Sequence, residues 1–156
     1  LTLTQLGLAN TKEEAYSKVS DAITSGRGLE YFKKLIISQS GNPDVIENYR
    51  LFPQPNYAFQ VKSPQDGFVW NIDAYKTAYA CKILGAGREK KTDQIDYSAG
   101  IYLNKICAEP VKQGEVVATL YANDADKLEA AQKHMEEAFS FSYEQRDRGS
   151  LIYKIL

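Results

Sequence analysis

The chain has a single histidine, His134. The surrounding pattern places His134 on a helix, between Lys133 and Met135. A metal site needs several convergent ligands, and neither a second histidine nor a cysteine lies at ligand spacing from His134. We therefore expect His134 to be a surface residue of a helix and not a metal ligand.

Three carboxylates, Asp93, Asp96 and Glu109, stand in segments with the composition of loops. General acid–base catalysis needs two carboxyl groups held near one bond, and spacing along the sequence does not show that arrangement. Loop carboxylates commonly accept hydrogen bonds from backbone amides and so cap turns. We predict this capping role for all three, with Asp96 binding loop amides just ahead of a strand.

The run Gly85-Ala86-Gly87-Arg88 has the composition of an anion site. Glycines let backbone amides approach an anion, and an arginine can bind phosphate through two nitrogens. However, the run lacks the Lys-Ser/Thr of a P-loop and does not open a helix. The favoured interpretation is a helix C-cap followed by a loop, with Arg88 making lobe-to-lobe contact if it has a role. The neighbouring pair Lys90-Lys91 is balanced by acidic residues elsewhere, which predicts a solvated loop.

Length and composition indicate one domain, or one domain with an appendage. The 156 residues are 44% apolar and 25% charged, and the net charge of -1 gives no electrostatic case for binding nucleic acid or an anionic membrane. No apolar run is long enough to span a bilayer, and no signal peptide is visible. Cys81 and Cys107 lack metal spacing, so we predict free thiols. We expect a cytoplasmic protein.

Two helices are predicted within residues 11–48, as an antiparallel hairpin. The first has a capping box from Thr11 to Glu14 and ends near Gly26. The second ends near Gly41, and Asn42-Pro43 predicts a short further turn through residue 46. Their apolar faces hold Ala15, Val19, Ala22 and Ile23 on the first helix and Leu29, Phe32, Leu35 and Ile36 on the second. Residues 49–56 contain two prolines and no periodicity, which predicts a connector and a domain boundary.

After the connector, the order β-β-α-loop-β-β-α-β-β predicts an α+β domain with a mostly antiparallel sheet. An Asp66-Gly67 turn suits a hairpin between the first two strands. The predicted strands are 57–62, 68–72, 101–105, 116–121, 139–143 and 151–155. The predicted helices are 73–85 and 124–138, and the predicted loop is 86–97. Residues 116–121 predict a strand buried on both faces, preceded by Gly114 at positive φ. On the first helix, Tyr75 and Tyr79 are expected to pack at the edge of the core.

Four blocks in the second half resemble the C-terminal region of pyrimidine-nucleoside phosphorylases, the family that includes thymidine phosphorylase. They are Gly85-Ala86-Gly87-Arg88, Ile95-Asp96-Tyr97-Ser98-Ala99-Gly100-Ile101, Val111-Lys112-Gln113-Gly114-Glu115 and Ala118-Thr119-Leu120-Tyr121-Ala122-Asn123. Three earlier blocks, 11–15, 25–32 and 41–43, are similar to the end of that family's large α/β domain. The sequence departs at Ala108-Glu109-Pro110, where the family usually carries Gly-Asp and a basic residue.

The resemblance implies an α/β-hammerhead, barrel-sandwich-like domain over residues 57–156, a linker over 49–56, and the end of the large domain over 1–48. It also implies a fragment of a pentosyltransferase of nucleoside salvage, a homodimer that converts a pyrimidine nucleoside and phosphate to the free base and (deoxy)ribose 1-phosphate. The family's phosphate-binding Lys-His-Ser/Thr-Gly-Gly segment lies upstream and has no counterpart here. We therefore assign no catalytic, cofactor or metal residue, and expect a structural lobe that contributes to closure over the cleft.

Two other functions fit parts of the sequence. Residues 62–72 and 111–122 resemble halves of biotinyl or lipoyl carrier domains, which need a lysine at a hairpin tip between the halves. The Asp126-Lys127 pair falls instead within a helical pattern, which argues against a carrier. A stand-alone interaction module, with the helical hairpin as its binding face, is the third interpretation.

Overall fold

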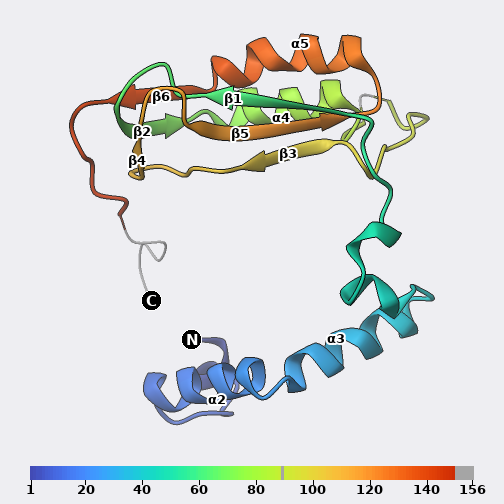
Figure 1. Ribbon diagram of the computed structural model, residues 1–156. Coiled ribbons are helices and arrows are strands. Elements are labelled where there is room, and N and C mark those ends of the chain that lie inside the picture. Colours follow the sequence, from blue (N-terminus) through green and yellow to red (C-terminus); the bar gives the residue numbers. More distant parts are fainter. Residues whose placement is uncertain (89, 150–156) are drawn as a thin grey trace. The chain divides into compact units, whose positions relative to one another are not determined.

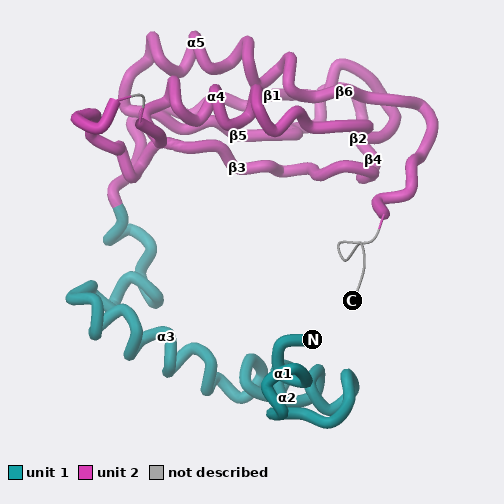
Figure 2. Tube along the Cα trace, turned by 180° about the vertical axis from the view of Figure 1, so that it is seen from behind, with its two compact units in different colours: residues 1–52 teal, residues 53–156 magenta. Residues whose placement is uncertain are grey.

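The chain forms two compact units, Leu1–Phe52 and a second unit that begins at Pro53 (Figure 2). The computed structural model describes residues 1–88 and 90–149. The division falls inside residues 49–56, where the sequence predicts a connector. A short 3-10 helix, η2 (Tyr49–Leu51), occupies the start of that segment and belongs to the first unit.

The first unit is entirely helical. Its elements are α1 (Thr2–Gln5), α2 (Lys12–Thr24), α3 (Arg27–Ser38), η1 (Pro43–Ile46) and η2. The predicted caps are present: the amide of Glu14 donates to Oγ1 of Thr11 over 3.1 Å, and the amide of Asp44 donates to Oδ1 of Asn42 over 2.9 Å. These side chains satisfy backbone donors that have no partner within the helix.

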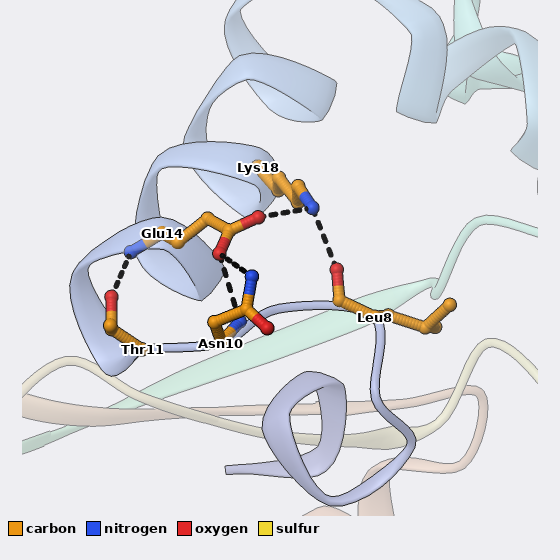
Figure 3. A network of polar contacts seen from close by, with 5 residues as sticks. All are labelled: Leu8, Asn10, Thr11, Glu14 and Lys18. Carbon is orange, nitrogen blue, oxygen red and sulfur yellow. Dashed lines mark hydrogen bonds and ion pairs between the residues drawn. The ribbon is translucent and has the colours of Figure 1, made fainter.

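A polar network binds the residues before α2 to the helix itself (Figure 3). Nζ of Lys18 donates to the carbonyl of Leu8 over 2.7 Å and lies 2.6 Å from Oε1 of Glu14. The amide of Asn10 donates to Oε2 of Glu14 over 2.8 Å. Glu14 therefore reaches back past Thr11 to Asn10, one residue further than the predicted capping box. Lys18 chiefly, together with Asn10, lowers the pKa of Glu14.

The predicted antiparallel pairing of the two long helices is not what the structure shows, because α3 leads away from α2 in both views (Figures 1 and 2). Val19 and Ile23, on the apolar face of α2, are 49% and 71% exposed. The physical reason is that the apolar face of α3 has a local partner, because Leu29 and Phe32 line a groove with residues of η1 and η2.

The described residues of the second unit form two helices and two small antiparallel sheets (Figure 1). Its elements are β1 (Tyr57–Lys62), β2 (Gly67–Ile72), α4 (Ala74–Leu84), β3 (Gly100–Leu103), β4 (Pro110–Val111), β5 (Val116–Ala122), α5 (Ala125–Glu136) and β6 (Phe139–Ser142). One sheet has the strand order β1-β5-β3 and the other β4-β2-β6. The predicted α+β class, with a helical part ahead of a sheet part, is confirmed. The strand predicted at 151–155 lies outside the described residues.

The predicted hairpin of β1 and β2 is wrong, since the two strands lie in different sheets. The turn between them bonds to a distant segment: the amide of Ser63 donates to the carbonyl of Glu115, and the amide of Gly114 to the carbonyl of Ser63, both over 2.8 Å. The amide of Gln113 donates to Oδ1 of Asp66 over 2.7 Å. These bonds hold the segment between β1 and β2, in which the chain crosses from one sheet to the other. Gly114 has the expected positive φ of 81°.

The hydrophobic core of the second unit is centred on β5, as predicted for a strand buried on both faces. Val117, Ala118, Leu120 and Ala122 are all 0% exposed. Helix α5 packs against α4, β1 and β5. It contributes Ala131 and Met135 to the core. The other core members are Val61, Val69, Ala80, Leu84, Val111, Ala138 and Phe139. In the part of the chain that the structure describes, no helix is long and apolar enough to cross a membrane.

Candidate functional site

The run Gly85-Ala86-Gly87-Arg88 ends α4, as the sequence predicts. Gly85 has a φ of 105°, which glycine adopts without steric cost. Its amide donates to the carbonyl of Lys82, and the amide of Ala86 donates to the carbonyl of Cys81. Two of the amides that could approach an anion are thus used to close the helix. Arg88 is exposed beyond them.

All three candidate carboxylates accept backbone hydrogen bonds within their own loops, which confirms the capping interpretation. Asp93 accepts from the amide of Lys90 over 2.8 Å, and Glu109 from the amide of Ile106 over 2.9 Å. Asp96 accepts from the amide of Ser98 over 3.0 Å.

Asp96 is the centre of a polar cluster at one end of the second unit. Oδ1 of Asp96 accepts from both the amide and the hydroxyl of Ser98, the latter over 2.7 Å. Its Oδ2 accepts from Nδ2 of Asn123 over 2.9 Å, and the same nitrogen lies 2.7 Å from Oγ of Ser98. Hydrogen bonds from Ser98 chiefly, and from Asn123, lower the pKa of Asp96, because they favour the ionised carboxylate.

This cluster joins segments that are far apart in the sequence. The amide of Asp96 donates to the carbonyl of Gly85 over 3.0 Å, at the end of α4. Asn123 follows β5 directly, and its Oδ1 accepts from the amide of Asn56, just before β1, over 2.9 Å. The sequence predicts the turn role of Asp96, but it does not predict the hydrogen bonds of Asn123 with Asp96 and with the amide of Asn56. Three of the four blocks with a family resemblance meet here.

The prediction for the aromatic residues of α4 is wrong. Tyr75 is 79% and Tyr79 is 37% exposed, while Ala80 and Leu84 are buried on the opposite face of α4. The two tyrosine rings stack at 6.4 Å between centroids. The ring of His134 meets Tyr79 edge-on at 4.9 Å, so this histidine is half-buried and not fully solvated.

The structure describes no metal centre. Among residues 1–88 and 90–149, no group of three or more His, Cys, Asp or Glu side chains could hold a metal ion. Cys81 and Cys107 are free thiols, as predicted, and burial raises the pKa of Cys81. Lys127 lies in the first turn of α5, where its amide donates to Oδ1 of Asp124 over 3.3 Å. That position is not the hairpin tip that a carrier domain needs.

Ala108 lies at a φ of 70°, in the left-handed region that favours glycine. Its amide donates to the carbonyl of Val69 over 2.8 Å, which holds the turn against β2. This is the position where the sequence departs from the family's usual glycine. The turn keeps its left-handed geometry and accepts the strain of a side chain there.

An apolar groove of about 460 Å³ opens on the first unit. Its lining residues are Leu29, Phe32, Ile36, Gly41, Asn42, Val45, Ile46, Tyr49 and Phe52. Phe32 is 52% and Tyr49 is 73% exposed. The sequence predicts an apolar face on α3, but the contributions of η1 and η2 follow only from the fold.

Comparisons with known proteins agree on one family. Residues 68–142 match the family model described as "Pyrimidine nucleoside phosphorylase C-terminal domain". The chain is similar to the pyrimidine-nucleoside phosphorylase of Staphylococcus haemolyticus, with 35% identity over 148 residues, which are 95% of this chain and 34% of that relative. It is 37% identical over 125 residues to the pyrimidine-nucleoside phosphorylase of Staphylococcus aureus strain USA300, covering 80% of this chain and 29% of that relative. The chain thus spans about a third of the length of these curated relatives.

Proposed function

Because this chain belongs to the pyrimidine-nucleoside phosphorylase family and contains that family's C-terminal domain, we propose that it serves as the C-terminal lobe of such an enzyme. The reaction of the whole enzyme converts a pyrimidine nucleoside and phosphate to the free base and (deoxy)ribose 1-phosphate. The observation that supports this proposal most is the match to a relative over 95% of the chain and only 34% of the relative.

In this proposal the lobe is structural, and none of its residues is assigned a catalytic, cofactor or metal-binding role. Phosphorolysis needs several cationic or amide donors that converge on phosphate beside the sugar. In the described part of the chain, the Gly85-Arg88 run is the candidate for such a grip, and it caps a helix instead. Phosphate is then a co-substrate held by upstream residues of the enzyme.

The partner of the first unit is the upstream part of the same phosphorylase. The groove on α3, η1 and η2 is apolar and exposed, and a large exposed apolar patch marks an interaction surface. Burying the exposed half of a side chain such as Phe32 contributes roughly 1 kcal/mol. We further propose a homodimeric enzyme of the cytoplasm, in which this lobe takes part in closure over the cleft and so in the exclusion of water.

A chimeric enzyme tests this function. The C-terminal third of the Staphylococcus haemolyticus relative is replaced by this chain, and base release from thymidine and uridine is measured with phosphate. We expect the chimera to be active and this chain alone to release base no faster than buffer. In the chimera, Phe32→Asp should lower activity strongly, while Tyr16→Asp, on the 78% exposed residue of α2 away from the groove, should not. Base release by this chain alone would contradict the structural role.

A stand-alone interaction module is the second candidate, and the same groove favours it. The two proposals differ in what fills the groove: the upstream part of the same phosphorylase in the first, and a separate partner in the second. If the chimera is folded and active but Phe32→Asp leaves its activity unchanged, the groove does not serve the phosphorylase and the module becomes the better explanation of the groove.

A further inference from the structure

Asn123 uses its whole side-chain amide to join two segments. Its Oδ1 accepts from the amide of Asn56 over 2.9 Å, and its Nδ2 lies 2.9 Å from Oδ2 of Asp96 and 2.7 Å from Oγ of Ser98. One side of the amide therefore holds the residue that ends the connector. The other side is held by a loop that is itself fixed to the end of α4.

The position of Asn123 extends the pairing of β1 and β5 by one contact. The last ladder pair at this end is Tyr57 with Ala122. One residue further out, the backbone of Asn56 finds its acceptor in a side chain instead of a strand. Pro55 lies immediately upstream and has no amide hydrogen to continue the ladder. Asn123 thus binds the backbone amide of Asn56, the last residue of the connector.

The segments on both sides of Asn123 are bonded to helix ends. Asp96 is bonded to the carbonyl of Gly85, which ends α4, and Asp124 caps α5 immediately after Asn123. The loop of Asp96 lies at the same end of the second unit as the connector (Figures 1 and 2). Movement of Asn56 away from the unit would require breaking a contact to these elements.

We propose that Asn123 is a positioning residue that fastens the end of the connector to the second unit, so that bending between the two units occurs upstream of Asn56. The inference does not depend on phosphorolysis. The chain pivots upstream of Asn56, and Asn123 is the side chain that holds the end of the connector on the second unit.

Amide hydrogen exchange, followed by NMR on the whole chain, tests this role. Asn123→Ala removes the acceptor, and a hydrogen bond of about 1 kcal/mol corresponds to a loss of protection at Asn56 of roughly fivefold. Protection at Phe59 and Val61, further along β1, should stay unchanged. The matched control is Asn104→Ala, which loses the bond from Oγ1 of Thr119 to Oδ1 of Asn104 in the same unit and should leave Asn56 unaffected.

A conservative exchange separates positioning from general stability. Asn123→Asp keeps an acceptor for Asn56 but sets a carboxylate beside that of Asp96, so protection at Asn56 should fall. Combining it with Asp96→Asn reverses the amide–carboxylate pair and should restore protection. Unchanged protection at Asn56 in Asn123→Ala, an equal loss along all of β1, or failure of the double variant to restore protection would each overturn the proposal.

Discussion

Replacing Leu120 by alanine tests whether β5 is the centre of the second unit. Leu120 is 0% exposed and lies opposite Phe59 on β1 and Ile101 on β3. The substitution removes three buried carbons, which costs about 2.4 kcal/mol at about 0.8 kcal/mol each. A residual cavity of about 50 Å³ adds about 1.2 kcal/mol. We therefore expect the free energy of unfolding to fall by about 3–4 kcal/mol.

Leu103→Ala is the matched control, because it makes the same chemical change on the neighbouring strand. Leu103 is 37% exposed and lies opposite Ala118. Part of its side chain is already in water, and the space it leaves is open to solvent. The expected loss is about 1.5 kcal/mol, without a cavity term.

Urea denaturation followed by tryptophan fluorescence measures both variants. The chain has one tryptophan, Trp70 on β2, so the signal reports on the second unit. At an m-value of about 2 kcal/mol/M, Leu120→Ala should lower the denaturation midpoint by about 1.5–2 M. Equal midpoint shifts in the two variants would refute the central position of β5.

Three further predictions use the same assay. Ala108→Gly should raise the free energy of unfolding by about 0.5 kcal/mol, because relief of left-handed strain exceeds the added flexibility of the unfolded chain; a lower midpoint would contradict this. Tyr75→Ala should change the free energy of unfolding by less than about 0.5 kcal/mol, since the residue is 79% exposed. A larger loss would indicate that Tyr75 packs in the core after all. Because the pKa of Asp96 is lowered in the folded state, its ionised carboxylate stabilises the fold at pH values above the usual pKa of 3.8. This contribution is lost as the pH falls through the lowered pKa. The gap in midpoint between wild type and Asp96→Asn should therefore narrow from pH 7 to about 2.5, and a constant gap would refute the effect of ionisation.

Local signals in the sequence predict the ends of elements well. Thr11, Asp73 and Asp124 each cap the helix that follows them, and Gly85 ends α4. In each of these cases the partner lies within four residues, so the short-range pattern contains the whole interaction. The turn role of Asp96 is predictable for the same reason, because its bond to Ser98 spans two residues.

Long-range pairing is less accessible from the sequence. An Asp-Gly turn between two apolar runs predicts a hairpin, but the amide of Gln113, 47 residues away, is the partner of Asp66 and directs β2 into the second sheet. The contact of Asn123 with Asn56 spans 67 residues. Neither asparagine has a local pattern that distinguishes it from a turn residue. The four residues of β6 and the two of β4 also owe their pairing to β2.

The buried face of α4 shows how packing decides between two patterns of equal period. Tyr75 and Tyr79 are four residues apart, and so are Ala80 and Leu84, so both pairs suit an apolar stripe. α5 packs against α4, and its small Ala131 belongs to the same buried cluster as Ala80 and Leu84. A small residue such as Ala80 allows the two helix backbones to approach, whereas a tyrosine would separate them. The sizes of residues on the facing helix therefore select the stripe.

The two units differ in how they are stabilised, and this difference bears on function. Among residues 1–52, all of which the structure describes, the buried apolar residues are Ala9 and Ala15. Ordering each residue costs about 1–2 kcal/mol of conformational entropy, which two alanine side chains do not offset. Among the described residues of the second unit, thirteen form a buried core around β5. We therefore expect the second unit to fold on its own contacts and the first to depend on a partner at its exposed apolar face, as the proposed lobe of a longer phosphorylase requires.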